Sequence, residues 1–129
     1  MNNHVPSLQT CQRLKELGYP QESEFYWCSF FDFEEKDKPI LVYGLDEYTK
    51  AKRLAAPLAS ELLEQLPDRI RNEANGDQTP LWFCKNKYTN DFLAEYHITF
   101  SSPIIALRDK SLSEVMAKMW IYLKEKGLI

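Results

Sequence analysis

The segment SEFYWCSFFDF, residues 23–33, carries six aromatic rings in eleven positions. Aromatic side chains favour β-strands, in which successive side chains point to opposite faces. Phe25, Trp27 and Phe31 therefore share one face, while Tyr26 and Phe30 share the other. Apolar side chains on both faces predict a strand that is covered on both sides.

The residues on either side of this segment predict a helix and a second strand. Before it, apolar residues at helical spacing predict a helix over residues 8–17, with Ser7 as its N-cap and Gly18 at its end. After it, a charged turn leads to residues 40–43, which predict an antiparallel strand. Residues 44–56 carry no pattern that favours a helix or a strand.

The middle of the chain predicts a second helix and a second pair of strands. Residues 57–66 place Pro57 in the first turn of a helix and repeat leucines at helical spacing. The polar residues 71–80 indicate a loop. Residues 80–86 and 92–100 then read as two strands joined by a turn.

The C-terminal segment predicts a long amphipathic helix. Ser111 and Glu114 fit a capping box, in which each side chain accepts a hydrogen bond from the backbone N–H of the other residue. Gly127 ends the helix. One broad face is apolar and consists of Leu112, Val115, Met116, Met119, Trp120 and Leu123.

The predicted order of elements is α-β-β-α-β-β-α. This order indicates an α+β fold with a four-stranded, mainly antiparallel sheet and helices on one face. A chain of 129 residues has the usual size of one domain, so we expect a single domain over residues 1–129.

The composition argues against several classes of protein. The net charge is −3, from 16 basic and 19 acidic residues, whereas nucleic-acid-binding domains usually gather positive charge. No apolar run reaches the roughly 20 residues of a membrane-spanning helix, and the N-terminus does not resemble a signal peptide. Three cysteines without a CxxC pair indicate a reducing, cytoplasmic setting.

Three segments together resemble a known group of proteins: GYPQESEFYW at 18–27, APLASELLEQLP at 56–67, and EVMAKMWIYLKEKGLI at 114–129. They are similar to short, uncharacterised proteins of bacteriophages and prophages. The chain departs from that pattern at Leu58 and Gln65, where the group has threonine and tryptophan. The resemblance implies origin in a mobile element and cytoplasmic expression, and it implies no activity.

Catalytic and metal-binding residues are sparse. Glu95 and His97 lie on the same, wetter face of a predicted strand, and such a pair can serve general acid–base chemistry. No nucleophile elbow, Walker loop, HExxH motif or glycine-rich loop accompanies them. Cys28 and Cys84 are isolated rather than paired at the spacing typical of zinc ligands. We therefore predict no enzyme activity, no cofactor and no metal site.

The aromatic segment is better suited to a core than to a ligand. The charged residues in and next to the segment are acidic: Glu22, Glu24, Asp32 and Glu34. Their carboxylates repel phosphates, which argues against direct nucleic-acid binding. Each buried ring removes roughly 150–250 Å² from water, which favours burial. The surplus rings suggest a surface for a partner protein or a second copy, formed by Phe25, Tyr26, Trp27, Phe30 and Phe31.

We therefore expect a non-catalytic accessory protein of the phage or prophage type that acts through protein–protein contacts, with a homodimer as one form of contact. Two alternatives remain open. One is a modulator of nucleic-acid enzymes or a weak nucleic-acid binder. The other is a small enzyme that uses Glu95 and His97.

Overall fold

A computed structural model of the chain describes residues 4–29, 39–44, 52–71, 76, 78–97 and 105–129. Within these residues lie three helices, α1 (Leu8–Glu16), α2 (Ala59–Gln65) and α3 (Leu112–Glu125). Seven strands accompany them: β1 (Phe25–Ser29), β2 (Ile40–Tyr43), β3 (Lys52–Ala55), β4 (Arg69–Arg71), β5 (Gln78–Asn86), β6 (Asp91–Tyr96) and β7 (Ile105–Asp109). The α+β class is confirmed, and the observed order broadly matches the predicted one.

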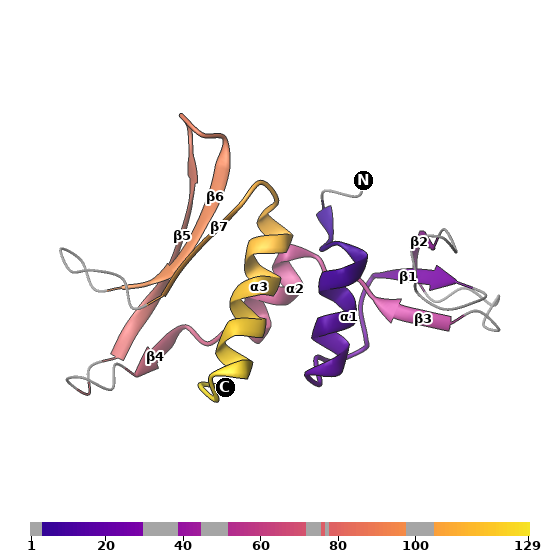
Figure 1. Cartoon of the computed structure of the whole chain (residues 1–129), viewed down its shortest axis with the longest axis horizontal. Coiled ribbons are helices and arrows are strands. Elements are labelled where there is room, and N and C mark those ends of the chain that lie inside the picture. Colours follow the sequence, from indigo (N-terminus) through magenta and orange to yellow (C-terminus); the bar gives the residue numbers. More distant parts are fainter. Residues whose placement is uncertain (1–3, 30–38, 45–51, 72–75, 77, 98–104) are drawn as a thin grey trace.

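The strands form two antiparallel sheets on opposite sides of the helices (Figure 1). One sheet has the order β2-β1-β3, and the other has the order β4-β5-β6-β7. A four-stranded antiparallel sheet with helices on one face is present, but its members differ from those expected. β1 and β2 belong to the separate three-stranded sheet, while β4 and β7 complete the larger one.

The aromatic strand β1 is the central strand of the three-stranded sheet. Trp27 lies opposite Leu41 of β2 on one side and Leu54 of β3 on the other. α1 covers this face, where Val5, Cys11 and Leu54 form a buried cluster. β3 lies inside residues 44–56, for which the sequence predicts no element. The strand has only four residues, of which two are exposed and charged, and four residues are too few to show a strand period.

The four-stranded sheet packs its inner face on α3. Tyr96 of β6 is fully buried, and its hydroxyl donates a hydrogen bond of 2.7 Å to the carbonyl of Pro67. Leu81 and Ile105 lie opposite Tyr96 on the neighbouring strands. Each fully buried side chain of this size stabilises the fold by about 1.5–3 kcal/mol. The face of α3 that meets the sheet and the other helices includes Val115, Met116, Met119 and Leu123.

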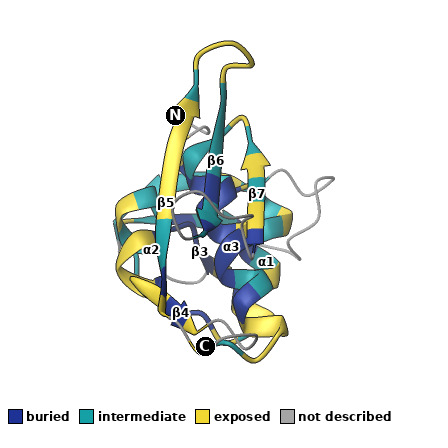
Figure 2. Ribbon diagram, turned by 90° about the vertical axis from the view of Figure 1, so that its left-hand side faces the viewer, coloured by how far each residue is buried: buried dark blue, intermediate teal, exposed yellow. Residues whose placement is uncertain are grey.

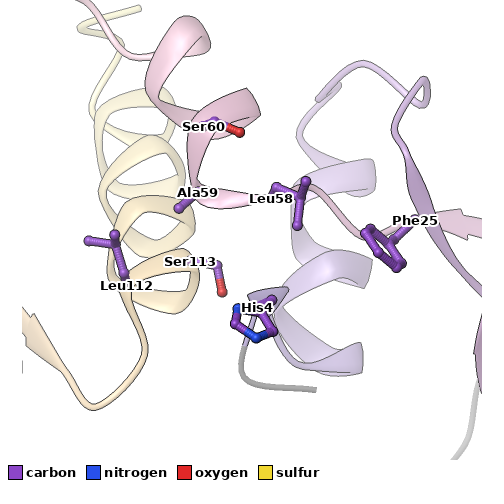
Figure 3. Close-up of a pocket in the computed structure, with 7 residues that line it drawn as sticks. All are labelled: His4, Phe25, Leu58, Ala59, Ser60, Leu112 and Ser113. Atoms are coloured by element: carbon purple, nitrogen blue, oxygen red, sulfur yellow. The ribbon is translucent and has the colours of Figure 1, made fainter. Parts of the chain in front are cut away.

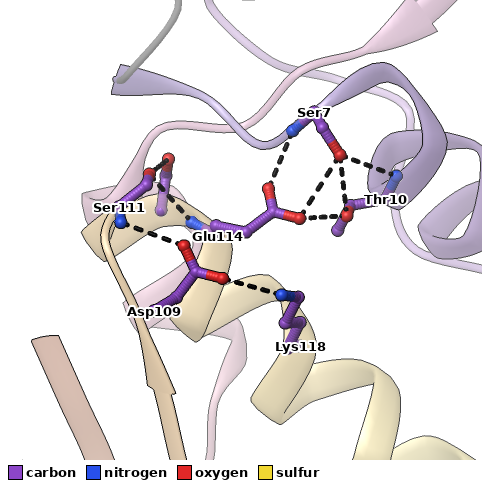
Figure 4. Close-up of polar contacts among 7 residues, drawn as sticks. Ser7, Thr10, Asp109, Ser111, Glu114 and Lys118 are labelled. Atoms are coloured by element: carbon purple, nitrogen blue, oxygen red, sulfur yellow. Dashed lines mark hydrogen bonds and ion pairs between the residues drawn. The ribbon is translucent and has the colours of Figure 1, made fainter. Parts of the chain in front are cut away.

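The predicted capping box of α3 is half confirmed (Figure 4). Ser111 accepts a hydrogen bond of 3.3 Å from the backbone N–H of Glu114. The glutamate, however, accepts from the backbone N–H of Ser7 at 2.8 Å and from the hydroxyl of Thr10, both at the start of α1. The predicted hydrogen bond from the backbone N–H of Ser111 to Glu114 is therefore wrong, because Asp109 accepts from the Ser111 N–H at 3.1 Å.

Glu61 plays a similar part in α2. Leu58 has no hydroxyl with which to cap the helix, but its backbone N–H donates a hydrogen bond of 2.7 Å to Glu61. The same carboxylate accepts from the hydroxyl of Ser23 at 3.0 Å, just before β1. Glu61 and Glu114 thus each satisfy backbone donors near a helix start while joining segments distant in sequence.

Candidate interaction surface

Tyr26, one of the predicted interaction residues, is buried within the chain. Only 5% of its surface is exposed. Its hydroxyl accepts a hydrogen bond of 3.0 Å from the N–H of Ser23, and the guanidinium of Arg53 lies 5.9 Å from its ring centroid. Tyr26 therefore contributes to the interior rather than to an exposed patch.

Phe25 and Trp27 are half-buried against the cluster beneath α1. The Trp27 indole donates a hydrogen bond of 3.3 Å to the carbonyl of Pro6. The Phe25 ring meets the Tyr43 ring edge to face, with 5.3 Å between the centroids. Contact of Phe25 and Trp27 with a partner stays a prediction, and Phe30 and Phe31 lie outside the described residues.

The larger sheet exposes aromatic side chains that the sequence analysis did not single out. Trp82 and Phe83 are each 48% exposed, and Tyr88 is 98% exposed. All three lie in the β5–β6 hairpin, which extends beyond the helices in both views (Figures 1 and 2). We call residues 82–95 the hairpin arm.

The hairpin arm carries apolar side chains on both faces. On its inner face Phe83 lies opposite Ala94, and Lys85 lies opposite Phe92. The Lys85 amine is 5.8 Å from the Phe92 ring centroid, within the range of a cation–π contact. On the other face Trp82 lies opposite Glu95, and Cys84 opposite Leu93.

The turn of the hairpin arm is held by hydrogen bonds with the side chains of Asn86 and Lys110. The Asn86 side chain accepts from the backbone N–H groups of Tyr88 at 2.9 Å and Thr89 at 3.4 Å. Lys110 donates from its amine to the carbonyl of Thr89 at 2.9 Å. Asn90 takes a φ of 55°, which asparagine adopts more readily than most residues. These bonds hold the backbone of the turn, and the Tyr88 side chain at its tip is exposed to solvent.

Glu95 and His97 are neighbours, as the strand pattern predicts. His97 Nδ1 lies 3.0 Å from Glu95 Oε1, and both side chains are about four-fifths buried, with 21% and 19% exposed. The contact lacks the alignment of a regular hydrogen bond. The Trp82 ring stacks on the imidazole with 5.5 Å between centroids and 26° between planes. The pair is a positioned imidazole beside a carboxylate, and Trp82 covers one ring face.

The cysteines do not assemble with His97. Cys28 lies in β1 and Cys84 in β5, so the two thiols belong to different sheets. Among the described residues no group of three potential ligands is placed to hold a metal ion. All three thiols are free, and burial raises the pKa of Cys11 to about 12.

A cavity of about 340 Å³ lies where the three helices begin (Figure 3). Phe25, Leu58 and Leu112 provide apolar walls. His4 also lines the cavity and is exposed, which the sequence analysis did not foresee. The hydroxyl of Ser113, which is buried at the cavity wall, is already hydrogen-bonded to the Ser111 hydroxyl at 3.0 Å. The cavity therefore offers no unsatisfied buried polar group to a ligand.

No protein-family model, curated protein or solved structure matches this chain. Within the described ranges, the helices are too short and too polar to cross a membrane.

Proposed function

We propose that this protein acts through protein–protein contacts made by the hairpin arm, and that a second copy of the chain is one such partner. The observation that supports the proposal is the exposure of Phe83 and Tyr88 in a hairpin that extends past the helices. Exposed apolar patches mark contact sites. Pairing with a second copy covers those rings.

The wider assignment is a non-catalytic accessory protein of the phage or prophage type that works in the cytoplasm. The resemblance of residues 18–27, 56–67 and 114–129 to such proteins supports the mobile-element origin. Three free thiols suit a reducing compartment.

The test of self-association is sedimentation velocity of the full chain at concentrations from about 1 μM to about 100 μM, the range of a weak dimer. We expect the sedimentation coefficient to rise with concentration. The double variant Phe83→Ser/Tyr88→Ser removes two exposed rings of the hairpin arm. It should weaken the dimer by about 30-fold or more if these rings are hot spots of about 2 kcal/mol.

Tyr43→Ser is the matched control, because Tyr43 is 73% exposed but lies in the three-stranded sheet. It should leave the dimer unchanged. A wild-type chain that remains monomeric over the whole range would refute self-association. Equal weakening by the control would refute the assignment of the contact to the hairpin arm.

A further inference from the structure

The outer face of the four-stranded sheet, which points away from α3, differs in chemistry from the rest of the molecule. Tyr96, Ala94 and Ile105 point inward, so alternate residues of the same strands point outward. By strand register the outer face includes Arg69, Arg71, Trp82, Cys84, Leu93, Glu95, His97, Ala106 and Arg108. No described helix covers this face (Figures 1 and 2).

The charge of the outer face is opposite in sign to that of the chain. By strand register this face carries three arginines, Arg69, Arg71 and Arg108, and two acids, Asp91 and Glu95, which gives +1 among the described residues, whereas the whole chain carries −3. Both acids lie beside a basic side chain, Glu95 beside His97 and Asp91 beside Arg108 at 3.8 Å. The exposed arginines of β4 therefore contribute a positive potential at the sheet edge.

Trp82 lies within this face and next to the arginine edge. Arg69 pairs with Pro80, two residues along β5 from Trp82, so Arg69 is a diagonal neighbour of the ring. The parallel stack on His97 orients the indole, and 48% of Trp82 remains exposed. An oriented, half-exposed ring beside cations is what stacking of a nucleic-acid base requires.

A second copy of the chain is a poor occupant for this face. A two-fold dimer places the same patch against itself, so the positive excess of one copy would face the positive excess of the other. Like charges placed opposite one another are destabilising. The positive excess instead favours a polyanion.

We propose that the outer face binds single-stranded nucleic acid, with a base stacked on Trp82 and backbone phosphates at Arg69 and Arg71. A duplex keeps its bases stacked on one another and hidden from such a ring, so the site selects single strands. The acidic residues that argue against nucleic-acid binding surround the aromatic segment of the other sheet. The site is separate from the proposed dimer contact at Phe83 and Tyr88.

The first measurement is quenching of intrinsic fluorescence when the full chain is titrated at low salt with oligo-dT or oligo-U of about 12 nucleotides, a typical site size. Trp120 is 6% exposed and Trp27 is half-buried, so quenching reports mainly on Trp82. Both single strands should quench, and a duplex of equal length should not. Absence of binding to either single strand, or equal binding of the duplex, would overturn the proposal.

The second measurement is the salt dependence of binding. Each phosphate contact contributes about 0.7 to the slope of log K against log salt for single strands, so Arg69→Gln/Arg71→Gln should reduce the slope by about 1.4. Lys124→Gln/Lys126→Gln removes the same charge from exposed lysines at the end of α3 and should leave the slope unchanged. Equal reduction by both pairs would show non-specific attraction and overturn the site.

The third measurement is anisotropy of a labelled oligonucleotide. Trp82→Ala should weaken binding by about 5-fold to 150-fold, the range of one base–aromatic stack. Phe83→Ala removes the adjacent ring from the opposite face and should have no such effect. Circular dichroism confirms that both variants are folded. Unchanged binding by folded Trp82→Ala would overturn the role of the ring.

Discussion

The two sheets use aromatic residues in opposite ways. In β1 the side chains of Phe25, Tyr26 and Trp27 are buried or half-buried, although the segment is the richest in rings. In β5, Trp82 and Phe83 are each 48% exposed. The density of rings in the sequence therefore does not indicate which rings reach the surface.

The length of the strands relative to the helices explains the difference. The nine residues of β5 span about 30 Å, whereas the fourteen residues of α3 span about 21 Å. The first part of β5 lies over the helices, where Thr79 is fully buried, and the part beyond Leu81 is exposed. β1 has only five residues and lies beside α1, so its rings are covered.

The largest expected effect is on the free energy of unfolding, when a ring is removed from one sheet or from the other. Tyr26→Ala should lower the free energy of unfolding by about 3–5 kcal/mol, because it leaves a cavity and deprives the N–H of Ser23 of its acceptor. Trp82→Ala should lower it by about 1 kcal/mol, since the ring is half-exposed. Urea denaturation measures both. Equal losses would contradict the contrast between the sheets.

A smaller effect is expected at the contact between the helices that cover the two sheets. Glu114 of α3 accepts from Ser7 and Thr10 of the α1 start, so Glu114→Gln should cost about 1–3 kcal/mol, the range for hydrogen bonds to a charged group.

Glu125→Gln provides the control for that substitution. It breaks an exposed ion pair between the same two helices, Arg13 with Glu125 at 2.9 Å, and should cost little because solvent screens the pair. Thermal or urea unfolding of both variants measures the difference. A loss at Glu114 no larger than that at Glu125 would mean that the helix start does not need the carboxylate.

The smallest effect is expected at Asp109, at the end of β7. Burial raises the pKa of Asp109, but the hydrogen bonds from Lys118 and Ser111 outweigh it and hold the pKa below its usual value. A carboxyl with a lowered folded pKa stabilises the fold above its unfolded pKa of about 4, and this stability is lost as pH falls through the folded pKa.

Asp109→Asn should therefore destabilise the protein at neutral pH, and the difference from wild type should shrink as the pH falls below about 4. Urea midpoints measured over this pH range provide the test. A difference that stays constant with pH would show that Asp109 acts through its shape or neutral hydrogen bonds and not through its charge.

Part of the candidate surface was predictable from strand alternation. The alternation in residues 92–97 correctly places Glu95 and His97 on one face, opposite the buried Tyr96. β7 carries a similar signal, since buried Ile105 alternates with exposed Ala106, but the predicted order of elements contains no strand there. β4 has three residues, too few for any period to be visible.

Local chemistry in the sequence determined the helices and placed their ends within two residues, because spacing, caps and glycines act within a few residues. Two local predictions were wrong: Pro57 lies before the N-cap Leu58 and not in the first turn of α2, and the predicted loop 71–80 contains the start of β5 at Gln78. It also determined that β1 is covered and that the chain is α+β. The tertiary structure alone decided the division into two sheets, the capping of α1 by Glu114 and the exposure of Trp82, Phe83 and Tyr88. These features depend on contacts between residues far apart in the chain. Local patterns do not predict where a helix ends relative to a longer strand that packs on it.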